Sequence, residues 1–352
     1  MTGRLRIGLV GTGWVAHQHV AGSRHVAADD VEIVAAADPR GDVLDDFATR
    51  YDIPHRFRDA TTMITSGTVD AIALLTPPAV RAEVLEPAFA QGIHVLIEKP
   101  FAQSGADAVT FTEAAEAAHV TLAVSQNFRW FPEYPWVRAQ VRRPEAGDVT
   151  FLEARTFQDR PQAGGVWRAE ETKLEMAIFS VHLIDRLRWI APTEPVGVRA
   201  LTRRRRGSTV RGEQWASLLV DFAGGGVGVV TSSWTSRRLP TNTFRVDTTH
   251  GSVAVQRSAP MAGTATGVAD FDGETPQEVV FSETRSGEHS ALSYGSSMRE
   301  FARAIAEGRD PAHSARDNLQ TMGLMEAAYL SAARNGSPVT IEEALHGHVA
   351  LR

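Results

Sequence analysis

Residues 5–16 read Leu5-Arg-Ile-Gly-Leu-Val10-Gly11-Thr-Gly13-Trp-Val-Ala16. A mostly apolar run, Leu5–Val10, predicts a strand and leads directly into a Gly-x-Gly-x-x-Ala sequence that opens a helix. The first glycine permits a tight turn, the second lets the backbone approach a pyrophosphate, and the small third residue lets the helix pack closely on its strand. The helix also points free N–H groups at the phosphates. The candidate dinucleotide contacts are therefore Gly11, Thr12, Gly13, Trp14, Val15 and Ala16.

Length and composition limit the classes of protein that remain. A chain of 352 residues exceeds what one hydrophobic core usually serves, so two domains are expected. Hydrophobic residues make up 43% and charged residues 22%, which argues against disorder. A net charge of −6 argues against a nucleic-acid-binding surface. The absence of cysteine excludes disulfides, thiolate nucleophiles and cysteine-ligated metals.

The sequence also indicates where in the cell the protein is expected. The amino terminus enters an apolar strand without a long hydrophobic leader, and no run of 18 apolar residues is present to span a membrane. We therefore expect a soluble, cytoplasmic protein without a membrane partner.

A carboxylate follows the second expected strand, Val31–Ala37. Asp38 lies 25 residues after Gly13, close to the position of an acid that hydrogen-bonds the adenosine ribose. As an alternative or additional role, Asp38 is the N-cap of the next helix, with Pro39 at its first position. The carboxylate would repel a 2′-phosphate, so NAD is the preferred cofactor. Arg40 is near enough to soften that preference and leaves NADP as a second candidate.

Strands and helices continue to alternate through residue 125. The expected strands are His55–Phe57, Asp70–Leu75, Val95–Glu98 and Val120–Ser125. The expected helices include one that begins at Thr76-Pro-Pro78 and ends at Gln91, and one from Ser104 to Ala118. Such alternation with short connections predicts a parallel sheet. The fold class is therefore α/β, with an N-terminal Rossmann domain over residues 1–125.

A lysine stands at the carboxyl end of the fifth strand, in His94-Val-Leu-Ile-Glu98-Lys99-Pro100. Open α/β sheets place their ligands at this edge. Partial desolvation there lowers a lysine pKa and makes the amine a usable proton acceptor. The alternative is an ordinary surface lysine just past a strand.

Residues 126–352 are expected to form an α+β domain around an open, mostly antiparallel sheet. The expected strands are Val149–Thr156, Val196–Thr202, Trp215–Phe222, Val227–Trp234 and Thr243–Asp247, with a hairpin connection at Ala223-Gly-Gly-Gly226.

An expected helix from Lys173 to Ile190 carries a polar stripe. Glu175, Ile178, His182 and Asp185 are spaced by three, four and three residues and so share one face. Histidine and aspartate on one face of an otherwise apolar helix indicate a lined pocket. The alternative is a satisfied core histidine.

The sequence contains further candidate site residues with less specific signals. Trp167 and Arg168 precede it and either line the substrate pocket or form an ordinary loop. The run Arg203–Arg206 is typical of a solvated strand edge; the alternative is binding of an anionic substrate or partner. The pairs His17/His19 and His346/His348 lack further ligands, so no metal site is predicted.

The chain resembles the Gfo/Idh/MocA oxidoreductases along most of its length. The resemblance is carried by Gly11-Thr-Gly13-x-x-Ala16, Asp38-Pro-Arg40, Thr76-Pro-Pro78, Glu98-Lys99-Pro100, Asn127-Phe-Arg-Trp130, Val181-His-Leu-Ile-Asp185 and the late segment 304–340. It implies an NAD(P)-dependent enzyme that acts on a sugar, cyclitol or related polyol. It further implies a homodimer or homotetramer that associates through the C-terminal sheet.

The resemblance also implies roles for individual residues. Lys99 would contact the substrate hydroxyl near the nicotinamide, Pro100 would follow a cis peptide bond, and His182 would act as general acid/base. Further cofactor contacts are expected from Thr76, Pro77, Glu98, Lys99 and Asn127. Substrate contacts are expected from Lys99, Arg129, Trp167, Arg168, His182 and Asp185.

Two positions depart from the pattern of the family's sugar and inositol dehydrogenases. Ile178 stands where an aspartate is frequent, four residues before the histidine, and Ser180 stands where a glycine is usual. Isoleucine cannot orient an imidazole, so either His182 has another partner or Lys99 carries more of the proton transfer. Glu175, about two helical turns (~10 Å) from His182, would bind substrate more easily than it would replace the aspartate. Two alternative functions remain: an NAD-dependent glycoside hydrolase and a non-catalytic NAD-binding regulator.

Overall fold

The chain forms two compact units. The computed structural model describes residues 3–160, 167–259 and 261–346. The first unit combines Met1–Trp130 with Ser290–Leu319, and the second combines Phe131–His289 with Gln320–Arg352. The boundary at residue 125 stays a prediction of the sequence; in the structure, Ser290–Leu319 clusters with the N-terminal residues rather than with the C-terminal ones.

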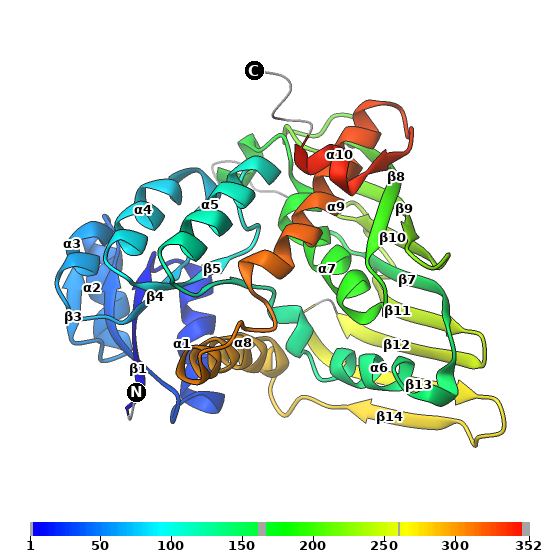
Figure 1. Cartoon of the computed structure of the whole chain (residues 1–352), viewed down its shortest axis with the longest axis horizontal. Coiled ribbons are helices and arrows are strands. Elements are labelled where there is room, and N and C mark those ends of the chain that lie inside the picture. The colour runs from blue at the N-terminus through cyan, green and yellow to red at the C-terminus, as the bar shows by residue number, and fades with distance from the viewer. Residues whose placement is uncertain (1–2, 161–166, 260, 347–352) are drawn as a thin grey trace. The chain divides into compact units, whose positions relative to one another are not determined.

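The first unit is built on the predicted Rossmann sheet. Six strands lie in the order β3-β2-β1-β4-β5-β6, and every neighbouring pair is parallel. The strands are β1 (Leu5–Val10), β2 (Val31–Ala37), β3 (His55–Phe57), β4 (Ala71–Leu74), β5 (His94–Glu98) and β6 (Leu122–Ser125). Their helices are α1 (Trp14–Val26), α2 (Gly41–Arg50), α3 (Ala60–Thr65), α4 (Ala82–Ala90) and α5 (Gly105–Ala117). The fold class is confirmed for this part of the chain (Figure 1).

Two local expectations in this unit were wrong. Pro78–Val80 forms a single 3-10 turn, so α4 begins at Ala82 rather than at the prolines. Asp38 is not the N-cap of α2, because that position is taken by Arg40. The aspartate side chain is instead turned back toward the glycine loop.

A helix from late in the sequence completes the first core. Met298, Phe301 and Ala302 of α8 (Glu288–Glu307) join a cluster of buried side chains from β1, α1, β2 and α2. The crossing of α8 with α1 is close: a Cβ on Gly22 would lie 2.1 Å from the carbonyl oxygen of Ala291. The core of the first unit therefore includes residues about 290 positions downstream of its first strand.

The second unit contains the predicted open sheet. Nine strands lie in the order β14-β13-β12-β11-β7-β10-β9-β8-β15, and only β7 and β10 pair in parallel. Five strands had been expected: β7 (Val149–Phe157), β8 (Pro195–Arg203), β9 (Trp215–Phe222), β10 (Val227–Ser233) and β11 (Thr241–Thr248). Four were not predicted: β12 (Gly251–Ala259), β13 (Ala262–Phe271), β14 (Gln277–Phe281) and β15 (Val339–Thr340).

Helices α6 (Glu133–Val141) and α7 (Val181–Ile190) contact this sheet, and α9 (Ala315–Ala333) and α10 (Ile341–His346) close the chain. The expectation of one regular helix from Lys173 to Ile190 was wrong. Met176–Ser180 is a π-helical turn, and the α-helix begins only at Val181. The regular spacing inferred for Glu175, Ile178 and His182 therefore does not apply across this turn.

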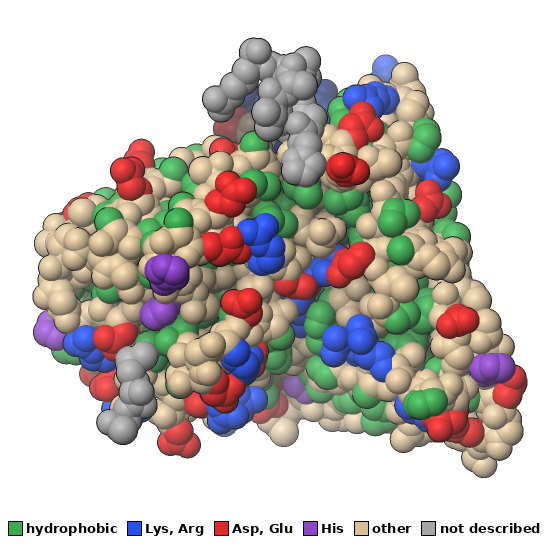
Figure 2. Space-filling model, in the orientation of Figure 1, with side chains coloured by type: hydrophobic (Ala, Val, Ile, Leu, Met, Phe, Trp, Pro, Cys, Tyr) green, Lys and Arg blue, Asp and Glu red, His purple; other side chains and the backbone are tan. Residues whose placement is uncertain are grey.

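The sheet alternates buried and more exposed side chains. In β9, Ala216, Leu218 and Val220 are buried, whereas Leu219 is 40% exposed. None of the described helices is long and apolar enough to cross a membrane. Acidic and basic side chains are interspersed over the face in view in Figure 2.

Candidate functional site

The glycine loop leaves its backbone open where the first helix begins. Gly11 has φ +96°, a conformation that favours glycine, and so makes the turn after β1. Gly13 is the N-cap of α1, and a Cβ built on it would meet no atom within 4 Å. The first turn of α1 contains no acidic residue. Open backbone at a helix N-terminus fits the phosphates of a dinucleotide.

Asp38 is held between the glycine loop and Arg40. Its Oδ2 accepts hydrogen bonds from the Thr12 backbone N–H and hydroxyl, both at 2.9 Å. The Arg40 backbone N–H and Nε donate to Oδ1 at 3.0 and 2.9 Å, and Nη2 donates to Oδ2 at 2.8 Å. Burial raises the pKa of Asp38, but these hydrogen bonds, that from Arg40 first, outweigh it and lower the pKa to about 2.

This geometry changes the expected role of Asp38. The carboxylate already accepts five hydrogen bonds, which uses its acceptor capacity of about four lone-pair sites. A ribose hydroxyl could bind it only if the Arg40 side chain, which is 60% exposed, moves away. Arg40 therefore controls access to Asp38.

Lys99 stands at the carboxyl end of β5, where the sequence predicted it. It is half-buried, and the Lys99–Pro100 peptide bond is cis, as expected. The preceding Glu98 is buried and lies 3.0 Å from His19, measured from Oε1 to Nε2. Burial raises the pKa of Glu98, but the hydrogen bond and charge of His19 and the charge of Lys99 outweigh it and lower the pKa.

Two residues of this edge were not predicted from the sequence. Arg81 is fully buried, and its Nε and Nη2 donate to the Thr76 carbonyl oxygen at 3.1 and 2.8 Å. Its Nη1 donates to the carbonyl oxygens of Pro100 and Phe101, so one guanidinium joins the segments that follow β4 and β5. His19, considered only as a metal ligand, instead contacts Glu98. Neither role has a local sequence signal, because Pro100 and Phe101 lie 19 and 20 residues after Arg81, and Glu98 lies 79 residues after His19.

Asn127 and Arg129 lie in the 3-10 turn Asn127–Trp130 after β6 and are buried. The Asn127 amide donates to the Ser293 hydroxyl at 2.8 Å. Arg129 donates from Nη1 to the Ala312 carbonyl oxygen and from Nη2 to Asp317, both at 2.7 Å. These contacts tie the end of the Rossmann sheet to the late segment of the same unit. A substrate contact by Arg129 stays a prediction.

His182 and Asp185 lie on α7 in the second unit. His182 is 3% exposed and follows the π turn directly, with its ring 6.4 Å from that of Phe179. Asp185 is buried, and its Oδ1 accepts a hydrogen bond from the Thr321 hydroxyl at 2.9 Å. Arg168 is half-buried in the 3-10 turn Trp167–Glu170, whereas the side chain of Trp167 lies outside the described part of the chain.

Glu175 forms a buried carboxyl site at the start of the π turn. Its oxygens accept hydrogen bonds from the Ser180 hydroxyl at 3.0 and 2.9 Å and from the Ser232 hydroxyl of β10. Burial raises the pKa of Glu175 to about 8, because the hydrogen bonds from Ser232 and Ser180 do not compensate for the lost solvation. The side chain is 0% exposed, so it faces protein rather than a ligand.

A second carboxyl group caps the same turn. Glu213 accepts hydrogen bonds from the backbone N–H groups of Leu174 and Met176, at 3.0 and 2.9 Å, and from the Tyr329 hydroxyl at 2.7 Å. Burial raises its pKa as well. The hydrogen bonds that Glu213 accepts from the backbone stabilise the π turn. π turns are frequent at functional sites.

We expect the substitution Glu175→Gln to become increasingly stabilising, relative to the parent protein, as the pH rises from about 4.5 to about 8. In this window the folded protein keeps a proton on Glu175 that the unfolded chain releases. The free energy of unfolding of the parent therefore falls by on the order of 1 kcal/mol per pH unit. Glutamine has the same shape and does not titrate. Its charged neighbours, Glu213 and Arg160, remain in place.

Urea unfolding of parent and variant near both ends of this window measures the difference. Glu170→Gln, at a side chain that is 70% exposed, is the matched control and should leave the pH dependence unchanged. A constant difference in stability between the Glu175→Gln variant and the parent at all pH values would contradict the raised pKa.

The part of the chain that the structure describes contains no group of three or more His, Asp or Glu side chains arranged to hold a metal ion. The side chain of His346 and the whole of His348 lie outside it.

The fold and the loop geometry define an oxidoreductase with an NAD-binding Rossmann domain: residues 5–126 match the model of that oxidoreductase family. Residues 134–254 match the model of the GFO/IDH/MocA C-terminal domain. The chain therefore belongs to the Gfo/Idh/MocA family, as the resemblance in the sequence predicted.

Relatives resemble the chain over nearly its full length. A D-apiose dehydrogenase of Paraburkholderia graminis is 28% identical, covering 96% of this chain and 90% of that protein. An inositol 2-dehydrogenase of Rhizobium meliloti is 25% identical, covering 94% and 97%. Among solved structures, a levoglucosan dehydrogenase in complex with NADH has a TM-score of 0.85 at 20% identity, covering 96% and 99%.

Proposed function

We propose that the protein oxidises a secondary hydroxyl of a sugar, cyclitol or related polyol to a ketone, with NAD as the hydride acceptor. The observation that carries this proposal is the position of Lys99 in the Rossmann sheet. The strand order reverses between β1 and β4, and ligands of open α/β sheets bind at the carboxyl edge beside such a reversal. The glycine loop follows β1, and Lys99 follows β5 on that edge.

The bound nicotinamide would accept the hydride at C4. Lys99 would take the hydroxyl proton as the C–H bond breaks, so that the alcohol loses one hydride and one proton. This requires the neutral amine, which the positive charge of the oxidised cofactor would favour. His182 is the second candidate for proton transfer, and Arg168 and Asp185 are candidates for holding the substrate.

The names of the relatives support the substrate class, since they are dehydrogenases of a sugar and of an inositol. The test is a panel of sugars, cyclitols and sugar derivatives incubated with NAD, with absorbance of NADH as the readout. Accumulation of NADH with a member of the panel is the expected result. Release of sugar from glycosides without net NADH would instead indicate the hydrolase alternative, and inactivity with every member would contradict both.

We expect Arg40→Ala to increase the preference for NAD over NADP. Arg40 covers Asp38 in the structure and is the cation nearest to it in the described chain. Its removal frees the carboxylate for the ribose hydroxyls and deletes a group that could pair with a 2′-phosphate. The ratio of kcat/KM for NAD to that for NADP should rise at least ~10-fold, since a charge-assisted hydrogen bond contributes about 1.5–3 kcal/mol. An unchanged ratio would assign the preference to other residues.

We further propose that the chain forms a homodimer or homotetramer through its C-terminal sheet. The supporting observation is that large apolar side chains are exposed on this sheet, including Val196, Leu201 and Leu219. Leu201 and Leu219 line one surface hollow together with Trp215 and Val229. Exposed apolar surface of this kind is typical of an interface. Sedimentation of the purified protein as a monomer at micromolar concentration would contradict this.

A further inference from the structure

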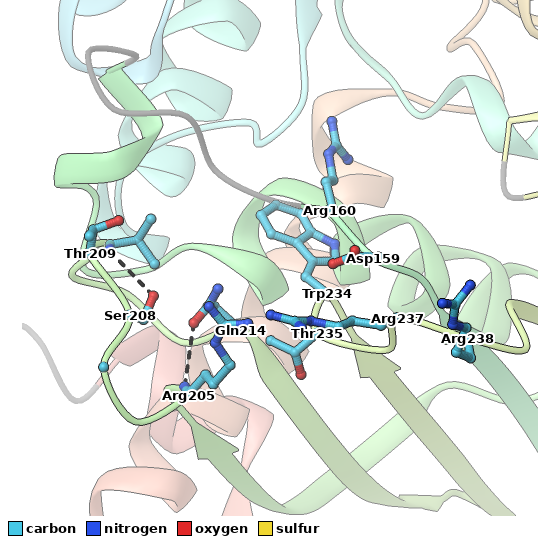
Figure 3. Close-up of a pocket in the computed structure, with 12 residues that line it drawn as sticks. Asp159, Arg160, Arg205, Ser208, Thr209, Gln214, Trp234, Thr235, Arg237 and Arg238 are labelled. Carbon is cyan, nitrogen blue, oxygen red and sulfur yellow. Dashed lines mark hydrogen bonds between the residues drawn. The ribbon is translucent and has the colours of Figure 1, made fainter.

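A pocket of about 490 Å³ lies entirely within the second unit (Figure 3). It opens beyond the carboxyl ends of β7 and β10, the parallel pair of the sheet. The backbone there continues the sheet: Arg160 donates its N–H to the Trp234 carbonyl oxygen at 3.0 Å, and Asp159 and Thr235 form a β-bridge. The volume is in the range of small-molecule sites.

The pocket has a strong excess of positive charge. Four arginines and one acidic residue line it: Arg160, Arg205, Arg237, Arg238 and Asp159. Within the described part of the chain, the guanidinium groups of Arg205, Arg237 and Arg238 form no salt bridge. Neighbouring guanidinium groups repel one another, and an anion bound among them would relieve that repulsion.

The wall of the pocket is built from buried or hydrogen-bonding groups. The Arg160 guanidinium lies 4.9 Å from the centroid of the Trp234 ring, and Trp234 is only 1% exposed. The indole N–H has no hydrogen-bond partner among the described residues. Gln214 is 6% exposed and accepts a hydrogen bond from the Arg205 backbone at 3.4 Å. Figure 3 shows Arg160 and Arg237 drawn on opposite sides of Trp234, with Gln214 hydrogen-bonded to Arg205.

Arg160, which lines the pocket, interacts electrostatically with Arg168 and Glu175. Burial, and then the positive charge of Arg168, lower the pKa of Arg160, while the charge of Glu175 opposes this. Glu175 in turn begins the π turn that precedes α7. The pocket therefore shares Arg160 with the electrostatic surroundings of Glu175 in the second unit.

We propose that this pocket binds the anionic oxygen group, a carboxylate or a phosphate, of a sugar acid or a sugar phosphate. The sugar nature of the ligand rests on the proposed function, whereas the binding of the anion does not. Guanidinium groups recognise both carboxylate and phosphate through paired hydrogen bonds, and the hydroxyls of Ser208 and Thr235 add neutral donors. The run Arg203–Arg206 thus contributes Arg205 to a binding site rather than only to a solvated edge.

The test is calorimetric titration of the full chain with D-gluconate, D-glucose 6-phosphate and D-glucose, followed by malonate and inorganic phosphate as minimal anions. We expect the anionic sugar of the correct class to bind at least ~10-fold more tightly than D-glucose at low salt, and less tightly as salt is added. Preference for gluconate and malonate assigns a carboxylate; preference for the two phosphates assigns a phosphate. Equal or absent binding of all four anions, relative to D-glucose, would overturn the proposal.

Substitutions of the arginines test whether the anion binds in this pocket. The double variant Arg205→Gln/Arg237→Gln should lower anion affinity at least ~10-fold, since it removes two guanidinium groups that can form charge-assisted hydrogen bonds with the anion. Both side chains are exposed, so folding should be unaffected. Arg206→Gln removes an exposed arginine of the same run that does not line the pocket, and it should leave affinity within twofold. Anion affinity that survives the double variant would overturn the proposal.

The same titrations separate this inference from the proposed function. Binding of an anion without formation of NADH from any sugar acid or sugar phosphate would leave the pocket assigned and refute the oxidation. NADH formed from a neutral polyol, without binding of any anion, would refute the pocket and leave the oxidation in place.

Discussion

Lys99→Met is expected to lower kcat by a factor of about 10²–10⁴, the contribution typical of a positioned general acid or base. Methionine keeps the length and most of the apolar stem of the side chain but cannot accept a proton. The buried pair of Glu98 and His19 behind Lys99 is unchanged, so the protein should fold normally. NADH binding, followed by fluorescence, should stay within a few-fold of the parent value. Steady-state turnover with the best substrate of the panel provides the measurement.

Two further variants test whether the loss of turnover comes from the missing proton acceptor at position 99. The chain contains only two lysines, Lys99 and Lys173, among 36 basic residues. Arginine does not lose its proton in proteins, so Lys99→Arg should be as inactive as Lys99→Met although it keeps the charge. Lys173, which lies 2.7 Å from Glu326 in an ion pair, is the matched control, and Lys173→Met should retain turnover within a few-fold. Normal turnover in Lys99→Met would remove Lys99 from the mechanism.

Gly22→Ala is expected to destabilise the first unit by about 1–3 kcal/mol, the usual cost of overpacking. The direction of this change in stability is informative, because alanine in a helix is normally more favourable than glycine by about 0.5–1 kcal/mol. Here the added Cβ would lie 2.1 Å from the Ala291 carbonyl oxygen and 2.5 Å from the Gly295 nitrogen. Both are backbone atoms, which cannot rotate away, so α1 and α8 would have to separate.

Thermal unfolding of parent and variants measures this effect. Gly295→Ala should behave similarly, since its Cβ would lie 2.1 Å from the Gly22 carbonyl oxygen. Gly3→Ala, where nothing lies within 4 Å of the added atom, is the control and should leave the unfolding temperature nearly unchanged. If Gly22→Ala instead increased the stability, as alanine does at an exposed helix position, α8 would not pack against α1 in solution.

The Rossmann sheet was predictable because its signals are local. Apart from His55–Phe57, which is largely exposed, each strand is a short, mostly apolar run bounded by turn residues. Ala71–Leu74 and Leu122–Ser125 are buried at every position. Strands β12–β14 were missed for the opposite reason. β13, for example, reads Ala-Gly-Thr-Ala-Thr-Gly-Val-Ala-Asp-Phe. Three of its four buried positions are alanine or glycine, which gives almost no alternation in hydrophobicity.

The π turn was not predictable from its own residues. Met176–Ser180 has the composition of a helix, and its caps come from Glu213 and Tyr329, which are far away in sequence. The position of Asp38 after a strand was predicted, but its enclosure by Arg40 was not, because the rotamer of an exposed arginine is not set by its neighbours in sequence. The sequence located candidate site residues such as Asp38, but not the partners that set their charge and access.

Helix α8 belongs to the core of the first unit but is synthesised long after residues 1–130 of that unit. The first unit lacks Met298, Phe301 and Ala302 of its core until the ribosome has added residues 131–289, which takes about 10–30 s at ~5–20 residues per second. During that interval the groove along α1 that receives α8 is exposed on the nascent chain. A gene fragment that ends after β6 would expose it permanently. Isolation of the nucleotide-binding unit therefore requires residues 290–319 to be supplied, in the same chain or as a separate peptide.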